Sequence, residues 1–239
     1  MKIGILATGI TPDELIDDFG SYAYMFEQLF GALDSGFEFE TYEVRDGDFP
    51  DSGDACDGWV ITGSKFNVYQ NLDWMVHLKQ LILDIYQAKK PMIGICFGHQ
   101  IVAEAFGGKV DKYPGGWGVG LHTYQLCSDK PWLDKEAAEF TINAMHQDQV
   151  LEKPDNAEVI AESEFCQFAA LNYDDLILTF QAHPEFSISY ESELVQARRG
   201  DVIPEQFTDP ALEGLKEEGA MAESLRVGGW MEAFLKQAS

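Results

Sequence analysis

A cysteine between two glycines is the first feature of the sequence that could do chemistry. Cys96 lies in Gly94-Ile95-Cys96-Phe97-Gly98-His99-Gln100, between an apolar run typical of a strand and a segment with helical spacing. On a tight strand-to-helix turn a nucleophile adopts a strained backbone, and small residues two places before and after it relieve the crowding. The N-terminus of the following helix would favour the thiolate form of the cysteine. The alternative is a buried structural cysteine whose glycines only permit close packing of strand and helix.

A His-Pro-Glu motif supplies the base that a cysteine nucleophile requires and a carboxylate to orient that base. The segment Gln181-Ala182-His183-Pro184-Glu185-Phe186 directly follows the apolar run 176–180. In an extended segment the side chains of His183 and Glu185 leave the chain on the same side, and Pro184 biases His183 towards that conformation. Alone, the motif is also typical of a surface turn. Together with Cys96 it predicts a nucleophile, a base and an orienting carboxylate.

Alternating strand and helix patterns would bring both motifs to one edge of a sheet. Strands alternating with helices predict a three-layer, flavodoxin-like α/β fold with a mostly parallel sheet flanked by helices. The strand-like runs are 2–8, 37–44, 58–62 and 91–95, and the helical ones are 22–33, 72–88 and 97–106. Shorter alternating segments predict added antiparallel strands at 119–126, 140–145, 157–161, 167–172 and 176–180. Open α/β sheets bind ligands at the carboxyl ends of their strands, where Cys96 would lie.

The remainder of the chain predicts a helical C-terminal extension. Residues 189–237 have the pattern of two or more amphipathic helices, with Pro204 and Pro210 between them. No repeat, low-complexity linker or domain boundary interrupts the 239 residues. We therefore expect a single domain over 1–239, with its core at about 1–190 and the extension at about 189–239.

The charge and the cysteines limit the classes of partner and compartment. With 41 acidic and 16 basic side chains the formal net charge is −25, which repels nucleic-acid phosphates and anionic membrane surfaces. We therefore expect no nucleic-acid partner and no membrane association. Four cysteines without a CxxC pair or a nearby metal-ligand histidine predict reduced thiols, a cytoplasmic protein and no metal. Nothing resembles a glycine-rich phosphate loop, and no cofactor is expected.

The two motifs together identify a family resemblance. The segments 94–100 and 183–185, in this order and separation, resemble those of the class I (triad) glutamine amidotransferases. Within that family the chain is most similar to the amidotransferase domain of GMP synthase and its stand-alone relatives, which include γ-glutamyl peptidases. The resemblance implies that Cys96 attacks the γ-carbonyl carbon of glutamine or a γ-glutamyl compound and forms a thioester. It further implies that His183 transfers the protons and that Glu185 orients His183.

The resemblance also implies an oxyanion hole and a substrate pocket. The oxyanion donors would be the backbone N–H groups of Phe97 and of Gly63, although the loop 61–64 lacks the Gly-Gly pair that many members carry and could be an ordinary turn. Gln100, Met145 and His146 match positions that contact the substrate, with Met145 in place of a small residue. As an alternative, His146 and Asp148 could form a hydrogen-bonded structural pair.

Three functions follow from these expectations. In the first, the chain hydrolyses a γ-glutamyl amide of glutamine or a peptide by itself. In the second, it is a glutaminase subunit that delivers ammonia to a separate synthetase, since the sequence ends at Ser239 without the ATP pyrophosphatase domain that a complete GMP synthase needs. In the third, the fold is a catalytically silent binding module, which gives no reason for an intact Cys96, His183 and Glu185.

Overall fold

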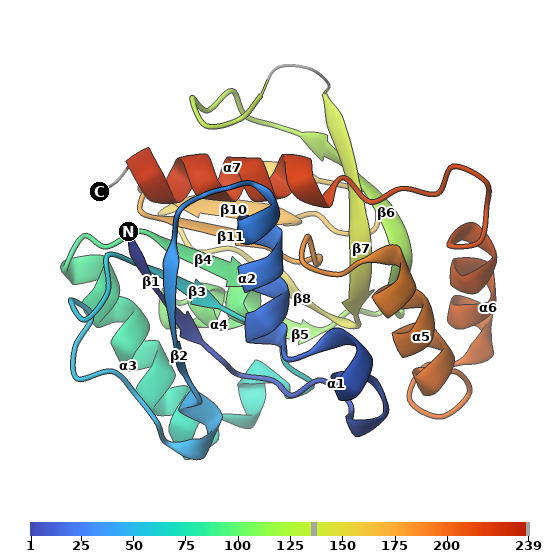
Figure 1. Cartoon of the computed structure of the whole chain (residues 1–239), viewed down its shortest axis with the longest axis horizontal. Helices are drawn as coiled ribbons and strands as arrows, with labels where there is room; N and C mark the ends of the chain where they lie inside the picture. The colour runs from blue at the N-terminus through green and yellow to red at the C-terminus, as the bar shows by residue number, and fades with distance from the viewer. Residues whose placement is uncertain (135–137, 238–239) are drawn as a thin grey trace.

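A nine-stranded mixed sheet forms the centre of the computed structural model, which describes residues 1–134 and 138–237 (Figure 1). The spatial order of its strands is β2-β1-β3-β4-β11-β10-β9-β6-β7. Neighbours from β2 to β11 run parallel, and neighbours from β11 to β7 run antiparallel. The parallel part comprises β2 (Glu38–Tyr42), β1 (Lys2–Leu6), β3 (Gly58–Ile61), β4 (Met92–Ile95) and β11 (Ile177–Phe180). The antiparallel part comprises β10 (Ala170–Tyr173), β9 (Ala157–Glu162), β6 (Gly118–Leu126) and β7 (Glu139–His146).

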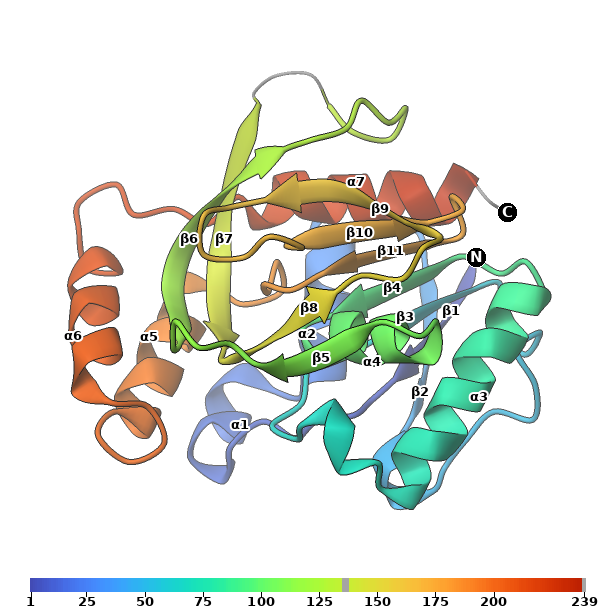
Figure 2. The ribbon, with the colours of Figure 1, turned by 180° about the vertical axis from the view of Figure 1, so that it is seen from behind.

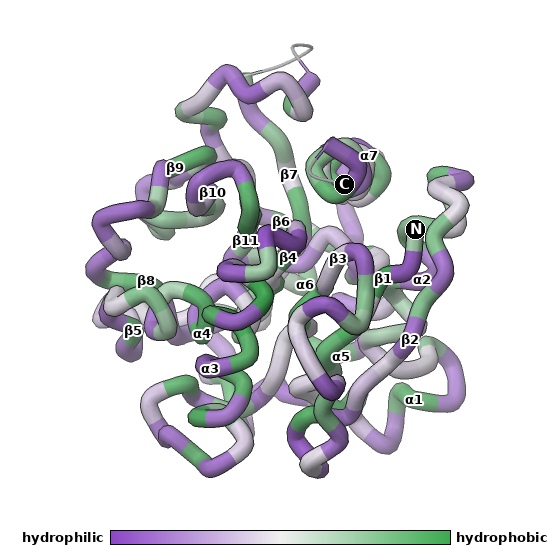
Figure 3. The backbone as a smooth tube through the Cα atoms, turned by 90° about the vertical axis from the view of Figure 1, so that its left-hand side faces the viewer, coloured by the Kyte–Doolittle hydropathy of each residue, from purple (hydrophilic) through white to green (hydrophobic). Residues whose placement is uncertain are grey.

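Helices cover both faces of this sheet, which confirms the predicted three-layer α/β class. One layer contains α2 (Tyr22–Ala32) and α7 (Ser224–Gln237), and the other contains α3 (Asp73–Gln87) and α4 (Phe97–Ala105) (Figure 3). Because side chains alternate along a strand, Ile3 and Ile5 of β1 pack against the first layer. Leu6 packs against the second. Burial on both faces explains why the central strands are short, continuous apolar runs.

The last helix returns to the sheet and belongs to its core. In α7 the side chains of Val227, Met231, Phe234 and Leu235 are fully buried, and the helix packs against α2 and β4. The two preceding helices, α5 (Ile188–Arg198) and α6 (Glu205–Gly214), pack on each other and on β6 (Figure 1). The segment predicted as an extension thus contributes one helix to a central layer and two helices at the far edge of the sheet.

The predicted direction of one strand relative to its neighbours is wrong. The run 176–180 was expected among the added antiparallel strands, but β11 pairs parallel with β4 and antiparallel with β10. All four residues of β11 are buried, as in a strand covered on both faces. The apolar pattern of a buried strand carries no information about which neighbour it joins, so the sequence could not fix the direction.

The position of Pro210 also differs from the prediction. Pro210 lies inside α6 and does not separate two helices. A proline at this position removes the hydrogen bond to the carbonyl of the residue four before it. The helix persists because Leu212 and neighbouring apolar side chains pack against Val119, Val195 and Ile203.

A second, two-stranded sheet and several short helices were not predicted. β5 (Lys109–Lys112) pairs antiparallel with β8 (Asp148–Glu152), beside α4 (Figure 2). The mostly polar sequence of β5 gives little strand signal. A short helix, α1 (Asp13–Phe19), precedes α2, and 3-10 turns lie at Val44–Asp46 and Val68–Gln70. Among the described residues, no helix is both long and apolar enough to cross a membrane.

The carboxyl ends of the parallel strands bring four sequence-distant loops to one edge. Thr8 follows β1, Gly63 follows β3, Cys96 follows β4 and His183 follows β11. Because β1, β3, β4 and β11 are consecutive neighbours in the sheet, these loops lie next to one another. The fold therefore assembles its candidate site where open α/β sheets bind ligands.

Candidate active site

Cys96 occupies a strained turn between β4 and α4. Its backbone has φ 51° and ψ −99°, a conformation that non-glycine residues rarely adopt. Its N–H donates to the Phe180 carbonyl at 2.8 Å, and its carbonyl accepts the N–H of Gln100 at 3.0 Å. The turn is thus fixed by the adjacent strand on one side and by the first turn of α4 on the other.

Both glycines around Cys96 are required by close backbone contacts. A Cβ on Gly94 would lie 2.8 Å from the Gly98 carbonyl oxygen, and a Cβ on Gly98 would lie 2.5 Å from the Ile61 carbonyl oxygen. These distances are too short for any side chain, and the atoms that would have to move belong to the backbone. The glycines therefore allow α4 to start close against β3 and β4, which is the packing that a sharp strand-to-helix turn needs.

His183 is held from three sides. Its Nδ1 lies 2.8 Å from Glu185 Oε1, and its backbone N–H donates to the Asn143 carbonyl at 2.7 Å. The amide of Asn143 donates to the Phe186 carbonyl at 2.9 Å, so Asn143 fixes both ends of the short segment. The Phe186 ring stacks on the imidazole, with centroids 3.9 Å apart and planes 6° from parallel. The ring of His183 therefore has little rotational freedom.

The charges around His183 favour its protonated form. Burial opposes the imidazolium, but the Glu185 carboxylate and the Cys96 sulfur overcome that effect and hold the pKa of His183 well above its usual 6.5. The side chain of Glu185 is fully buried, so its interaction with the imidazolium is weakly screened by water. A protonated histidine beside a cysteine is the arrangement in which an enzyme histidine can protonate a leaving group.

Two backbone N–H groups beside Cys96 are unused. Within the described residues, neither Gly63 nor Phe97 donates its N–H to a protein acceptor. Gly63 lies against the reactive groups, since a Cβ there would be 2.9 Å from His183 Cε1 and 3.7 Å from Cys96 Cβ. This is the arrangement in which two N–H groups can stabilise an oxyanion formed at the nucleophile.

A buried threonine fixes the direction of the Gly63 N–H. The Thr62 carbonyl accepts the Thr8 hydroxyl at 2.9 Å, with the Gly63 carbonyl as a second acceptor at 3.1 Å, and the Thr8 N–H donates to Thr62 Oγ1 at 3.0 Å. In a trans peptide the carbonyl and the following N–H point in opposite directions. Because Thr8 holds the Thr62 carbonyl on the interior side, the N–H of Gly63 is directed away from Thr8.

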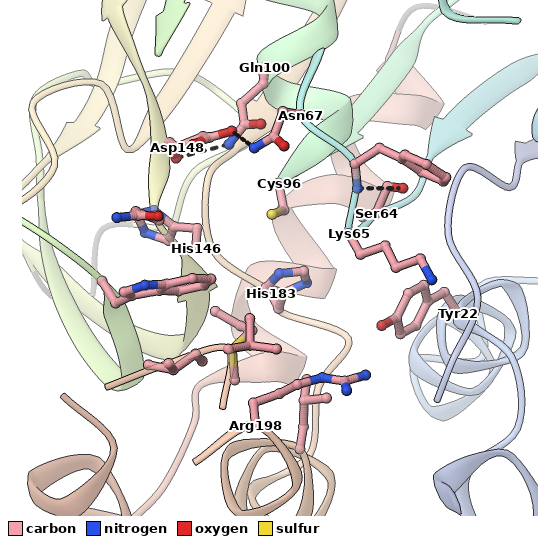
Figure 4. A pocket seen from close by; sticks show the side chains of 18 of the residues that line it. Tyr22, Ser64, Lys65, Asn67, Cys96, Gln100, His146, Asp148, His183 and Arg198 are labelled. Carbon is pink, nitrogen blue, oxygen red and sulfur yellow. Dashed lines mark hydrogen bonds between the residues drawn. The ribbon is translucent and has the colours of Figure 1, made fainter. Parts of the chain in front are cut away.

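Cys96 and His183 line a cavity of about 380 Å³ (Figure 4). One side of this cavity carries amide, imidazole and carboxylate groups, from Asn67, Gln100, His146 and Asp148. The Gln100 amide donates to the Asp148 carbonyl at 3.0 Å and lies 3.2 Å from Gln181 Oε1. A concave site with several convergent polar groups is typical of small-molecule binding.

The alternative pairing of His146 with Asp148 is absent. The Asp148 carboxylate instead accepts hydrogen bonds from the Asn67 amide and the Tyr69 hydroxyl. The His146 ring has no side-chain hydrogen-bond partner among the described residues and lies near the Asp148 backbone, and burial lowers the pKa of His146 to about 3. A neutral imidazole that lines the cavity is available to a ligand.

The structure brings most of the residues singled out in the sequence into one cavity. Its lining includes Cys96, His183, Gly63, Gln100, Met145 and His146. Glu185 lies behind His183 and does not line the cavity, and the Phe97 side chain is fully buried, so that only its N–H could take part. Glu185 thus contacts His183 from outside the cavity, and the role of the Phe97 N–H as an oxyanion donor stays a prediction.

The sequence did not single out several residues of this region. Thr8 and Asn143 hold the candidate site from behind, and Tyr22, Lys65 and Arg198 line the cavity. A signal existed for Thr8 and Lys65, which follow parallel strands as Gly63 and Cys96 do. The other three come from elements whose place in the fold depends on long-range packing.

The comparison with protein families agrees with this geometry. Residues 14–198 match the model of the family described as glutamine amidotransferase class-I, which is well over half of the chain. The chain belongs to the class I glutamine amidotransferase family.

Relatives of two kinds occur within the class I amidotransferases. The chain is 33% identical over 202 residues to γ-glutamyl peptidase 3 of Arabidopsis thaliana, covering 81% of this chain and 80% of the relative. It is 26% identical over 183 residues to a glutamine-hydrolysing GMP synthase subunit of Halobacterium salinarum, covering 76% and 92%. The structure of a glutamine amidotransferase from Thermotoga maritima matches with a TM-score of 0.76 at 17% identity, covering 99% of this chain and 97% of that one, which shows a shared fold.

Proposed function

We propose that this class I amidotransferase relative hydrolyses a γ-glutamyl amide through a thioester on Cys96. The Cys96 thiolate attacks the γ-carbonyl carbon, and the oxygen that becomes negative is stabilised by the N–H groups of Gly63 and Phe97. The C–N bond then breaks as the His183 imidazolium gives its proton to the leaving nitrogen. This step leaves a γ-glutamyl thioester, a free amine and a neutral His183.

Water completes the reaction. His183 takes a proton from a water molecule as its oxygen attacks the thioester carbon. The C–S bond breaks, which releases the γ-carboxyl group of glutamate and restores the Cys96 thiolate and the His183 imidazolium. Glu185 orients the imidazole and stabilises its positive charge throughout, without itself transferring a proton.

One observation carries this proposal. His183 is hydrogen-bonded to Glu185 at 2.8 Å and lies beside Cys96 and the unused N–H of Gly63. Cys96, His183 and Gly63 all line the same cavity. A binding module would not need a strained cysteine, a buried carboxylate and a free backbone donor at one point. Because Cys96 must stay a reduced thiol to act, we further propose a cytoplasmic location.

A second function is supported by a different observation. The alignment covers 92% of the Halobacterium protein, whose name describes one subunit of a glutamine-hydrolysing GMP synthase. By analogy, this chain could act as a glutaminase that passes ammonia to a separate synthetase chain. The 33% identity to a γ-glutamyl peptidase favours the self-sufficient hydrolase.

Turnover by the purified chain distinguishes these functions. The substrates are L-glutamine, glutathione and a γ-glutamyl anilide, with Cys96→Ala as the inactive variant and Cys127→Ala, which removes an exposed thiol, as the matched control. We expect steady hydrolysis of a γ-glutamyl compound that is lost only in Cys96→Ala. Glutamine hydrolysis that requires an added synthetase would support the ammonia-delivering function. Absence of both turnover and Cys96 labelling by a glutamine-like electrophile would contradict any catalytic function.

A further inference from the structure

The candidate cavity continues past Cys96 to a positively charged end. In Figure 4, Lys65, Tyr22 and Arg198 lie on the side of Cys96 and His183 opposite to Gln100, Asn67 and Asp148. Lys65 comes from the loop after β3, and Arg198 is the last residue of α5. Arg198 is half-buried and Lys65 is exposed. The reactive sulfur thus lies between a side that carries amide groups, Asp148 and Lys112 and an end that carries two cations without an acid.

The charge at this end is opposite to that of the whole chain. The protein carries 41 acidic and 16 basic side chains. Of the charged groups that line the cavity in the described residues, Lys65 and Arg198 lie at this end, whereas Lys112 is paired in register with the one acid, Asp148, on the other side. An anionic ligand would be repelled by the protein as a whole, so a local cluster of cations is what would let such a ligand enter.

The charged groups of Lys65 and Arg198 have no acidic partner among the described residues. In the described part of the chain, no ion pair or side-chain hydrogen bond of either residue is found. The adjacent Arg199 is different, since it pairs with Glu205 and Asp209 at 2.8 and 2.6 Å. Unpaired cations in a cavity of a strongly acidic protein are available to an anion that comes from outside.

The proposed reaction determines which part of the substrate meets these cations. Cys96 attacks the γ-carbonyl carbon, and the leaving group begins at the amide nitrogen bonded to that carbon. If the glutamyl half occupies the side with Gln100 and His146, this leaving group extends towards Arg198 and Lys65. An arginine guanidinium offers paired N–H donors that match a carboxylate, and a lysine adds a point charge. Ammonia, the leaving group of glutamine, has no carboxylate that these side chains could bind.

We propose that Arg198 and Lys65 bind a carboxylate on the leaving group, so that the preferred substrates are γ-glutamyl peptides with a free C-terminal carboxylate. This inference rests on the proposed function, because it assigns the leaving-group side of the same site. It distinguishes such peptides from glutamine and from γ-glutamyl compounds whose leaving group is neutral.

Binding to a silent variant tests this inference without turnover. In full-length Cys96→Ala, calorimetry compares γ-glutamyl-alanyl-glycine with its C-terminal amide, and γ-glutamyl-glycine with its amide. The free acid of at least one pair should bind about tenfold or more tightly than its amide, as expected for a charge-assisted hydrogen bond. Adding Arg198→Gln should remove most of this preference, and Arg198→Lys should keep part of it. The matched control is Arg199→Gln, which removes the same charge from a residue outside the cavity and should leave the preference intact.

Two results would overturn the inference. One is equal or undetectable binding of acid and amide in both pairs, and the other is an acid preference that survives Arg198→Gln combined with Lys65→Gln. Failure of the proposed hydrolase function would be detected separately, as absence of turnover by the protein with Cys96 intact. A preference for the acid in binding, without turnover by that enzyme, would contradict the hydrolase and support the carboxylate site.

Discussion

The hydroxyl of Thr8 donates to the carbonyl of Thr62 at 2.9 Å, although the two residues are 54 positions apart in the chain. Thr8 follows β1 and Thr62 follows β3, and both are fully buried. The bond orients the peptide group whose other end is the N–H of Gly63. A residue that touches no substrate thus determines where one of the two proposed oxyanion donors points.

Thr8→Val should lower kcat by about tenfold or more with a smaller change in KM. Valine keeps the shape of threonine but leaves the Thr62 carbonyl free to turn, and removal of an oxyanion donor outright costs about 10²–10³ in kcat. The measurement is steady-state hydrolysis of a γ-glutamyl anilide, with thermal unfolding to verify the fold. Thr123→Val, which removes an exposed hydroxyl paired with Thr141, is the control and should retain activity. An unchanged kcat for Thr8→Val would refute this role.

Gly98→Ala should destabilise the protein and abolish turnover. The new Cβ would lie 2.5 Å from the Ile61 carbonyl oxygen, so the start of α4 must move away from β3. We expect a loss of about 1–3 kcal/mol in the free energy of unfolding, measured with urea. Gly31→Ala is the matched control, because nothing lies within 4 Å of its Cβ position in α2, and there alanine should be neutral or stabilising. Equal stability of the two variants would show that the turn tolerates a side chain.

Glu191→Gln should flatten the dependence of stability on pH. Glu191 is fully buried, with one oxygen accepting the Gly120 N–H at 3.0 Å. Burial raises its pKa from 4.5 to about 7, although the positive charge of His183 opposes the shift. Between these values the folded state keeps a proton that the unfolded state has lost, so stability falls as pH rises from 4.5 towards 7.

The protonated and ionised forms of Glu191 should give a measurable difference in the free energy of unfolding. At pH 8 the free energy of unfolding of Glu191→Gln should exceed that of the unmodified protein by up to about 3 kcal/mol, and below pH 4.5 the gap should be small. Urea unfolding at several pH values provides the measurement. Glu193→Gln, an exposed change on the same helix, should alter neither value. Parallel pH profiles for Glu191→Gln and the unmodified protein would be inconsistent with a raised pKa.

His183→Asn and Glu185→Gln should differ in severity. Asparagine cannot transfer the protons, so His183→Asn should reduce kcat nearly as much as Cys96→Ala. Glutamine at position 185 keeps a hydrogen bond to the imidazole but not the charge, and the loss in kcat should be roughly 100-fold smaller. Rapid-quench kinetics of both variants on one substrate tests the order. A larger loss for Glu185→Gln would mean that the carboxylate does more than orient His183.

The sequence predicted the parts of the site that depend on local backbone chemistry. Gly94 and Gly98 permit close backbone contacts and Pro184 restricts its neighbours, and the structure places Cys96 and His183 at neighbouring loops as these patterns indicated. Their catalytic roles stay predictions. The family model and the layered fold agree with the resemblance that the motifs gave.

What the sequence could not give depends on long-range packing. The direction of β11 is set by its insertion between β4 and β10, which is not encoded in its own apolar residues. Asn143 reaches His183 only because the end of β7 passes beside the loop after β11. The cationic end of the cavity likewise combines Lys65 with Arg198, whose separate sequence surroundings suggest no common ligand.

Mass spectrometry of the trapped acyl-enzyme tests the central claim most directly. The unmodified chain is mixed with a γ-glutamyl peptide, quenched in acid during turnover and digested for peptide mapping. We predict a γ-glutamyl group on Cys96 and on none of Cys56, Cys127 and Cys166, and neither acylation nor turnover in Cys96→Ala. Acylation of another cysteine, or continued hydrolysis by Cys96→Ala, would contradict Cys96 as the nucleophile.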